Sequence, residues 1–163
     1  MIELELTIDI AADADTVFAG VTDWTAQREW MLGTDVVPVF GDGVGKGARL
    51  EAWTGIGRVG FLDTMTVTEW DDAARSVTVL HTGKVVRGGG EMSVVALGPD
   101  RSRFVWSEWL ELPLGVVGRL GWPVVRPVFV TGVRQSLRAF AELAESGRWE
   151  VPRRDTLARP GSG

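Results

Sequence analysis

The first ten residues alternate strictly between apolar and polar side chains. Five apolar positions on one side face four polar ones on the other: Ile2, Leu4, Leu6, Ile8 and Ile10 against Glu3, Glu5, Thr7 and Asp9. A period of two residues predicts a β-strand with one buried face and one solvent-facing face. Such half-buried strands are typical of antiparallel sheets.

The longest stretch with a helical period runs from Trp122 to Ser146. Its apolar positions recur at spacings of three and four residues, at Phe129, Val133, Leu137, Phe140 and Ala144. This stripe predicts one long amphipathic helix. Two prolines, at 123 and 127, suit its first turn, and a glycine at 147 suits its C-terminal cap. Because the stripe has to be buried, a large apolar surface must lie opposite it.

Two short helices are expected after the first strand. Asp13 or Asp15 can cap a short helix that carries Val17, Phe18 and Val21, and Asp23 can start a second one that carries Trp24 and Trp30. Further strands are predicted over 36–40, 48–54, 58–70, 76–82, 87–97 and 102–112, separated by turn signals such as TGIG, DDAA, TGK and GPD. The element order predicts an α+β fold in which one sheet packs against one long helix. A curved antiparallel sheet of about seven strands wraps on one long C-terminal helix.

Length and composition favour a single self-sufficient domain. Residues 1–148 of the 163-residue chain are expected to form it, and 149–163, which lack an apolar period, to be a mobile tail. The chain has no Cys and one His, so neither disulfides nor a structural metal site is expected. The segment GDGVGKGAR at 41–49 has no Ser or Thr after its lysine, so it predicts a hairpin connection rather than a phosphate loop. No cofactor is expected.

Charge and hydropathy restrict the location and the partners. No signal peptide and no uncharged apolar run of membrane-spanning length is apparent, so we expect a cytoplasmic protein without stable membrane insertion. The net charge of −5 argues against nucleic acid as a partner. Residues 1–118 carry 9 basic and 18 acidic side chains, whereas 119–163 carry 8 and 4. This asymmetry fits a solvated helix face or a docking surface for an acidic partner. Monomer and homodimer both stay open.

A ligand cavity is the first functional hypothesis. Strands twist, so a long sheet curls, and one helix cannot fill the concave side of seven strands. The chain contains eight Trp and no Tyr, and aromatic side chains without hydroxyl groups suit an apolar interior. The remaining volume is either packed by these side chains or open to a ligand.

Three polar residues are candidates for catalysis. By strand parity, Asp63, His81 and Glu108 each share a face with large apolar side chains, so all three are expected to point towards the helix. Burial would raise the pKa of a carboxyl group, and a neighbouring carboxylate would raise that of the imidazole. We therefore take His81 as the acid–base group, oriented by Glu108 or Asp63. The alternatives are a structural His81, an Asp63 that faces water, and a Glu108 paired with an arginine at 58, 87 or 103. A one-residue slip of register would turn each side chain outwards.

Three segments resemble a known family. GFLDTMTVTEWDD (60–72), LHTGKVVRGGGEM (80–92) and FVWSEWLELPLGVVGRLGWPVVRP (104–127) are similar to the START and birch-pollen-allergen (SRPBCC) superfamily. The likeness is closest to its actinobacterial polyketide cyclase/dehydrase and lipid-transport-like branch. The resemblance implies a helix-grip fold over residues 1–148 and a hydrophobic ligand. Members include both carriers and aromatase/cyclases.

Three functions follow from these observations. The first is binding of a lipid- or polyketide-like small molecule between sheet and helix. Its expected lining residues are Trp30, Phe40, Phe61, Met65, His81, Met92, Trp106, Glu108, Phe129, Val133 and Phe140. The second is an aromatase/cyclase-type enzyme that uses His81, Glu108 and Asp63. The third is a protein-interaction module without a ligand cavity.

Overall fold

The computed structural model describes residues 1–111 and 116–150 of the chain. Seven strands and one long helix dominate it, with short helices between the first two strands. In chain order the elements are β1 (Ile2–Ile10), α1 (Ala14–Val21), the 3₁₀ turn η1 (Trp24–Ala26), α2 (Gln27–Trp30), β2 (Thr34–Phe40), β3 (Arg49–Ile56), β4 (Val59–Asp71), β5 (Ser76–His81), β6 (Arg87–Gly98), β7 (Arg101–Glu111) and α3 (Val116–Glu145).

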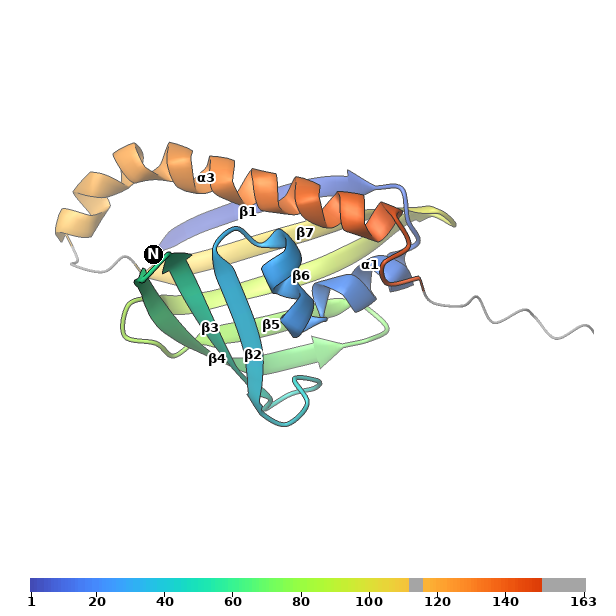
Figure 1. Cartoon of the computed structure of the whole chain (residues 1–163), viewed down its shortest axis with the longest axis horizontal. Coiled ribbons are helices and arrows are strands. Elements are labelled where there is room, and N and C mark those ends of the chain that lie inside the picture. The colour runs from blue at the N-terminus through green and yellow to red at the C-terminus, as the bar shows by residue number, and fades with distance from the viewer. Residues whose placement is uncertain (112–115, 151–163) are drawn as a thin grey trace, which may run out of the picture.

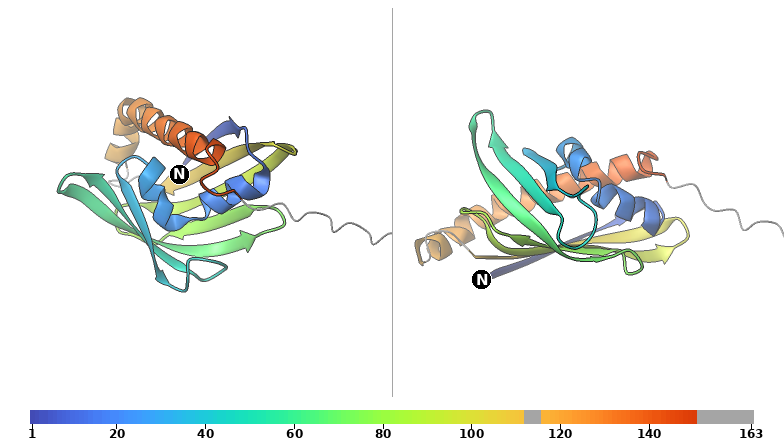
Figure 2. Two further views of the ribbon diagram at one scale, coloured as in Figure 1. Left: turned by 45° about the vertical axis from the view of Figure 1, so that its right-hand side comes forward. Right: turned by 90° about the horizontal axis from the view of Figure 1, so that it is seen from below.

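The strands form one antiparallel sheet in the order β1-β7-β6-β5-β4-β3-β2. Consecutive strands from β2 to β7 are neighbours, and β1 adds to the free edge of β7. Figure 1 shows α3 lying along the concave side of this sheet, and Figure 2 shows the β3–β4 hairpin curling up at one side. The expected helix-grip architecture is confirmed.

The local signals at the start of the chain act as expected. Leu4, Leu6 and Ile10 of β1 are buried, whereas Glu3 and Glu5 on the other face of the strand are exposed. Asp13 caps α1, because its carboxylate accepts from the backbone N–H groups of residues 15 and 16 at 3.1 and 3.0 Å. Asp23 caps η1 by accepting from the N–H of Ala26 at 3.2 Å. These caps position α2, which later supplies one wall of the cavity.

The long helix starts earlier than the sequence pattern indicates. It begins at Val116, so Pro123 and Pro127 lie inside it and the prediction of a first-turn position was wrong. Both prolines are exposed, where water can satisfy the carbonyl groups that lose their N–H partners. The apolar stripe marks only the part of α3 that packs on the sheet. The N-terminal part carries exposed apolar side chains such as Val124 and Val128.

The C-terminal end of the core also differs from the prediction. Gly147 has φ 84° and closes α3 as expected. Trp149, assigned to the mobile tail, packs its ring 5.4 Å from that of Phe140 and donates from Nε1 to Asp23 Oδ2 at 3.1 Å. A single aromatic residue after a helix cap has no period from which its burial could be predicted. The rest of the expected tail, 151–163, lies outside the described residues.

No helix within residues 1–111 and 116–150 has the length and apolar character that crossing a bilayer requires.

Candidate active site

A cavity of about 340 Å³ lies between the sheet and α3. This volume falls within the range of small-molecule sites, which is roughly 300–1,000 Å³. The expected lining residues that border it are Trp30, Phe61, Met65, His81, Met92, Trp106, Glu108, Phe129 and Val133, and Asp63 borders it as well. The cavity argues against the interaction-module hypothesis, which required that none exist.

Phe40 does not line the cavity. It lies at the end of β2, is 64% exposed and stacks under the guanidinium of Arg49 at 5.5 Å. A register shift between Pro38 and Phe40 explains the error, because a bulge moves the next side chain to the other face of the sheet. Strand parity alone could not predict this shift.

Phe140 does not border the cavity either. Its ring is fully buried and contacts three other aromatic rings, those of Trp30 at 4.9 Å, Phe104 at 5.3 Å and Trp149 at 5.4 Å. These rings fill the space below the C-terminal half of α3. The apolar stripe of α3 therefore has two parts: Phe129 and Val133 border the cavity, whereas Phe140 packs in the closed core.

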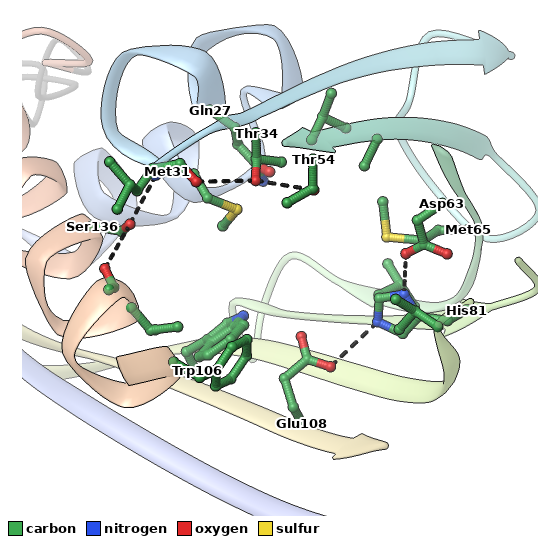
Figure 3. A pocket seen from close by; sticks show the side chains of 18 of the residues that line it. Gln27, Met31, Thr34, Thr54, Asp63, Met65, His81, Trp106, Glu108 and Ser136 are labelled. Carbon is green, nitrogen blue, oxygen red and sulfur yellow. Dashed lines mark hydrogen bonds and ion pairs between the residues drawn. The ribbon is translucent and has the colours of Figure 1, made fainter. Parts of the chain in front are cut away.

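Asp63, His81 and Glu108 meet at one side of the cavity (Figure 3). The two carboxylates approach opposite sides of the imidazole, with His81 Nδ1 2.5 Å from Asp63 Oδ2 and His81 Nε2 3.3 Å from Glu108 Oε2. Asp63 is 5% exposed and Glu108 8%. Glu108 therefore pairs with His81 rather than with an arginine, and Arg103 instead binds Asp9.

The glycine run in β6 allows this meeting. β6 lies between β5, which carries His81, and β7, which carries Glu108, and it places Gly88 opposite His81 and Gly90 opposite Glu108. A Cβ on Gly90 would lie 2.7 Å from Glu108 Oε1. Because Gly88 and Gly90 have no side chains, the His81 and Glu108 side chains can meet across β6. This steric role depends on strand pairing, so it cannot be recognised from the glycine run in the sequence alone.

The charges of the three groups are coupled. Burial lowers the pKa of His81, but the hydrogen bonds and charges of Asp63 and Glu108 outweigh it and raise that pKa to about 9. Burial raises the pKa of Glu108, and the neighbouring imidazole opposes this only in part. The site therefore favours the protonated imidazole of His81, whereas burial disfavours the charged form of Glu108.

His81 also borders a second hollow, outside the main cavity. This hollow has a volume of about 640 Å³ and is lined by residues 80–84, Arg87, Gly88 and Glu111. His81 thus lies between the cavity and the protein surface. Of the polar atoms in the described residues, Asp63 Oδ1 and Trp30 Nε1 are buried without a hydrogen-bond partner.

A second polar wall lies across the cavity from Glu108 (Figure 3). It comes from α2, β2 and β3, and sequence analysis did not identify it. The hydroxyl groups of Thr34 and Thr54 form a hydrogen bond of 3.1 Å. Gln27, which is 3% exposed, lies beside them. Polar residues on short elements give no periodic signal, so the sequence offered little to find them.

No group of three or more His, Cys, Asp or Glu side chains in the described parts of the chain could hold a metal ion.

The curled antiparallel sheet that encloses a cavity against a long C-terminal helix defines a helix-grip fold. Residues 1–145 match the family described as "Polyketide cyclase / dehydrase and lipid transport", and the chain belongs to this family. No curated protein matched the chain.

Solved structures support the same assignment of fold. The Zhui aromatase/cyclase from Streptomyces sp. R1128 superposes with a TM-score of 0.74 at 18% identity, over 90% of this chain and 95% of that one. The di-domain ARO/CYC BexL from the BE-7585A biosynthetic pathway gives 0.71 at 20%, over 91% of this chain, which spans about half (48%) of BexL. A START superfamily protein from Mycobacterium smegmatis gives 0.61 at 19%, over 90% and 96%. At these identities the likeness establishes the fold.

Proposed function

We propose that the protein binds a hydrophobic, polyketide-like ketone in the cavity and catalyses its enolisation, as an aromatase/cyclase-type enzyme. The observation that carries this proposal is the Asp63–His81–Glu108 set inside an otherwise largely apolar cavity. Buried carboxylates and a buried imidazole are costly unless they are paired, and perturbed titratable groups in a cavity are typical of catalytic sites. A carrier of apolar molecules has no need of them.

Glu108 is the group that faces the ligand. Both nitrogens of His81 are engaged by carboxylates, so the imidazole is the orienting member. Figure 3 shows one oxygen of Glu108 directed at His81 and the other towards the open cavity. This assignment reverses the roles of His81 and Glu108 in our initial hypothesis, in which His81 was the acid–base group.

The chemistry requires one proton shuttle. Ionised Glu108 removes a proton from the carbon next to a ketone, and the C–H electron pair becomes the C=C bond of an enolate. The enolate carbon attacks a second carbonyl of the same molecule, and the oxygen of that carbonyl takes the proton back from Glu108. Glu108 then removes a second proton from the carbon next to the carbonyl and returns this proton to the new hydroxyl group. The C–O bond breaks, a C=C bond forms, and the group leaves as water with Glu108 ionised again. The imidazolium of His81 stabilises Glu108 whenever it is ionised.

The comparisons support the substrate class. The family name includes polyketide cyclase and dehydrase, and two structural neighbours, Zhui and BexL, are aromatase/cyclases. Apolar side chains on β4, β6, β7 and α3 provide the surface for the ligand: Met65, Met92, Trp106 and Phe129. Burial of this surface would supply the affinity, and the polar groups would supply the orientation.

Deuterium exchange tests both parts of the proposal. 2-Tetralone in D2O loses its α-proton signals in NMR as it enolises, and the wild-type protein is expected to accelerate this loss. Glu108→Gln should lower the acceleration by about 10²–10⁴-fold, the usual contribution of a general base. Glu3→Gln, on the exposed face of β1, is the matched control and should leave the rate unchanged.

Binding has to be followed in the same samples. Retention of 2-tetralone by Glu108→Gln in equilibrium dialysis shows that the cavity is intact. If wild type and Glu108→Gln bind the ketone equally and neither accelerates exchange, the protein is a binder and not an enzyme. Native mass spectrometry of the purified protein, followed by solvent extraction, then identifies the chemical class of any molecule that co-purifies.

A further inference from the structure

Gln27 is the polar residue of the cavity that the proposed reaction leaves without a role. Its side chain is 3% exposed, borders the cavity and makes no hydrogen bond to another described residue. Its amide atoms are not among the fully buried side-chain atoms that lack a partner, so they face the open space of the cavity. An amide that faces a cavity and bonds no other residue is free to donate to or accept from a ligand.

The surrounding structure holds Gln27 in place. It is the first residue of α2, and its carbonyl oxygen accepts from the N–H of Met31 at 2.7 Å. The preceding 3₁₀ turn is fixed by the Asp23 cap and by the Trp24 Nε1 bond to the carbonyl oxygen of Gly43 at 2.8 Å. The amide is therefore presented to the cavity from a rigid element, as a binding group requires.

A second polar residue of the cavity shows the contrast. Ser136 accepts from the backbone N–H of Leu32 at 2.9 Å and donates to the carbonyl oxygen of Gly132 at 3.1 Å. Both bonds join chain segments, so the role of Ser136 is structural. Gln27 makes no such bond, and beside it the paired hydroxyl groups of Thr34 and Thr54 keep lone pairs that can accept from a ligand.

We propose that Gln27, with the Thr34–Thr54 pair, forms a second polar subsite that binds an oxygen substituent of the ligand. This inference rests on the proposed function, and it narrows the substrate class. The ligand carries one carbonyl or hydroxyl oxygen for Gln27 and a separate reacting carbon for Glu108. An apolar body joins the two positions and lies on Met92 and Trp106.

The arrangement of strands supports the separation of the two positions. Thr54 is on β3 and Glu108 on β7, with β4, β5 and β6 between them. Four strand spacings of about 4.8 Å give roughly 19 Å along the curved sheet, so the direct distance across the cavity is shorter. Figure 3 shows Gln27 and the threonine pair on one side of the open space and Glu108 on the other.

Two probes of matched shape test the subsite. 2-Acetylnaphthalene and 2-isopropenylnaphthalene differ only in a C=O in place of a C=CH2 group, and their dissociation constants are measured by equilibrium dialysis. Gln27→Leu is expected to weaken ketone binding about 3- to 10-fold relative to the alkene, the effect of one neutral hydrogen bond. Alkene binding should stay unchanged. Gln135→Leu, at an exposed position of α3, is the matched control and should preserve the wild-type ratio.

Thermal unfolding provides a second readout. Replacing a structural glutamine would lower the melting temperature. Replacing an amide that bonds no other residue by leucine, which fills the same space with apolar contacts, is expected to raise it by about 2–4 °C. Thr54→Val, which keeps the shape of the side chain, is an independent variant and should weaken ketone binding in the same direction. Loss of ketone binding together with a raised melting temperature supports the subsite.

Three results would overturn the inference. If Gln27→Leu binds both probes and the ratio of the ketone to the alkene dissociation constant is the same as in wild type, the subsite is refuted and the proposed function is unaffected. A ratio that changes in Glu108→Gln but not in Gln27→Leu places the carbonyl at Glu108 and also refutes it. If the wild-type protein binds neither probe, cavity binding itself fails and the subsite with it.

Discussion

The charge state of His81 offers the most direct test of the site. It is the only histidine in the chain, so its ring signals in NMR are unambiguous. Asp63 and Glu108 contact it from inside the protein, and Lys84, Arg87 and Glu111 line the outer hollow that it borders. Because the pKa of His81 is raised from 6.5 to about 9, its ring signals should titrate near pH 9.

The same shift predicts how stability depends on pH. The folded protein holds the proton of His81 more tightly than the unfolded chain does, so this contribution is complete below about pH 6.5 and disappears as the pH rises through about 9. A shift from 6.5 to about 9 corresponds to about 3 kcal/mol. The raised pKa of Glu108 acts in the same direction, since it too favours proton binding by the folded state.

Denaturant unfolding between pH 6 and 10.5, followed by Trp fluorescence, measures this dependence. The quantity of interest is the difference between wild type and His81→Gln, because contributions from other groups are common to both proteins. This difference should fall by about 3 kcal/mol from the acidic to the basic end of the range. A ring titration at or below pH 6.5, or parallel stability curves for the two proteins, would refute a charged imidazole held by two carboxylates.

Two further substitutions test the packing around the site and at the chain end. Gly90→Ala places a methyl group 2.7 Å from Glu108 Oε1, so it should lower the free energy of unfolding by about 1–3 kcal/mol and abolish exchange activity. Gly98→Ala, which has open space around the new methyl group, is the control and should change the free energy of unfolding by no more than about 0.5 kcal/mol. Equal effects in denaturant unfolding would contradict the steric role of Gly90. Trp149→Ala should cost about 3 kcal/mol. Arg148→Ala, which removes a surface ion pair with Glu29 and a cation–π contact with the Trp149 ring, should cost less. A Trp149→Ala protein as stable as wild type would show that the core ends before residue 149.

Much of the fold could be predicted from local pattern. The alternation in β1, the caps at Asp13 and Asp23 and the stripe of α3 are signals that each element carries in its own residues. The predicted strand boundaries agree with the structure within two residues. The errors concern features that have no period of their own. They are the bulge that turns Phe40 outwards, the start of α3 at Val116 before its apolar stripe, and the packing of Trp149 after the helix cap.

The candidate site was predictable only in part. Parity within each strand correctly indicated that Asp63, His81 and Glu108 face the helix. It could not show that their side chains meet, because that depends on the order of β4, β5 and β7 in the sheet and on the glycines of β6 between them. Nor could it show which residue faces the ligand, since this depends on which atoms of His81 are already bonded.

The sequence by itself therefore determined the secondary structure, the helix-grip architecture and the facing of the polar residues, because period and capping are local properties of the chain. Tertiary structure alone decided the volume left between sheet and helix, the pairing of Glu108 with His81 and the position of Gln27 opposite them. These are distances between residues far apart in the sequence, and only the packed chain sets them.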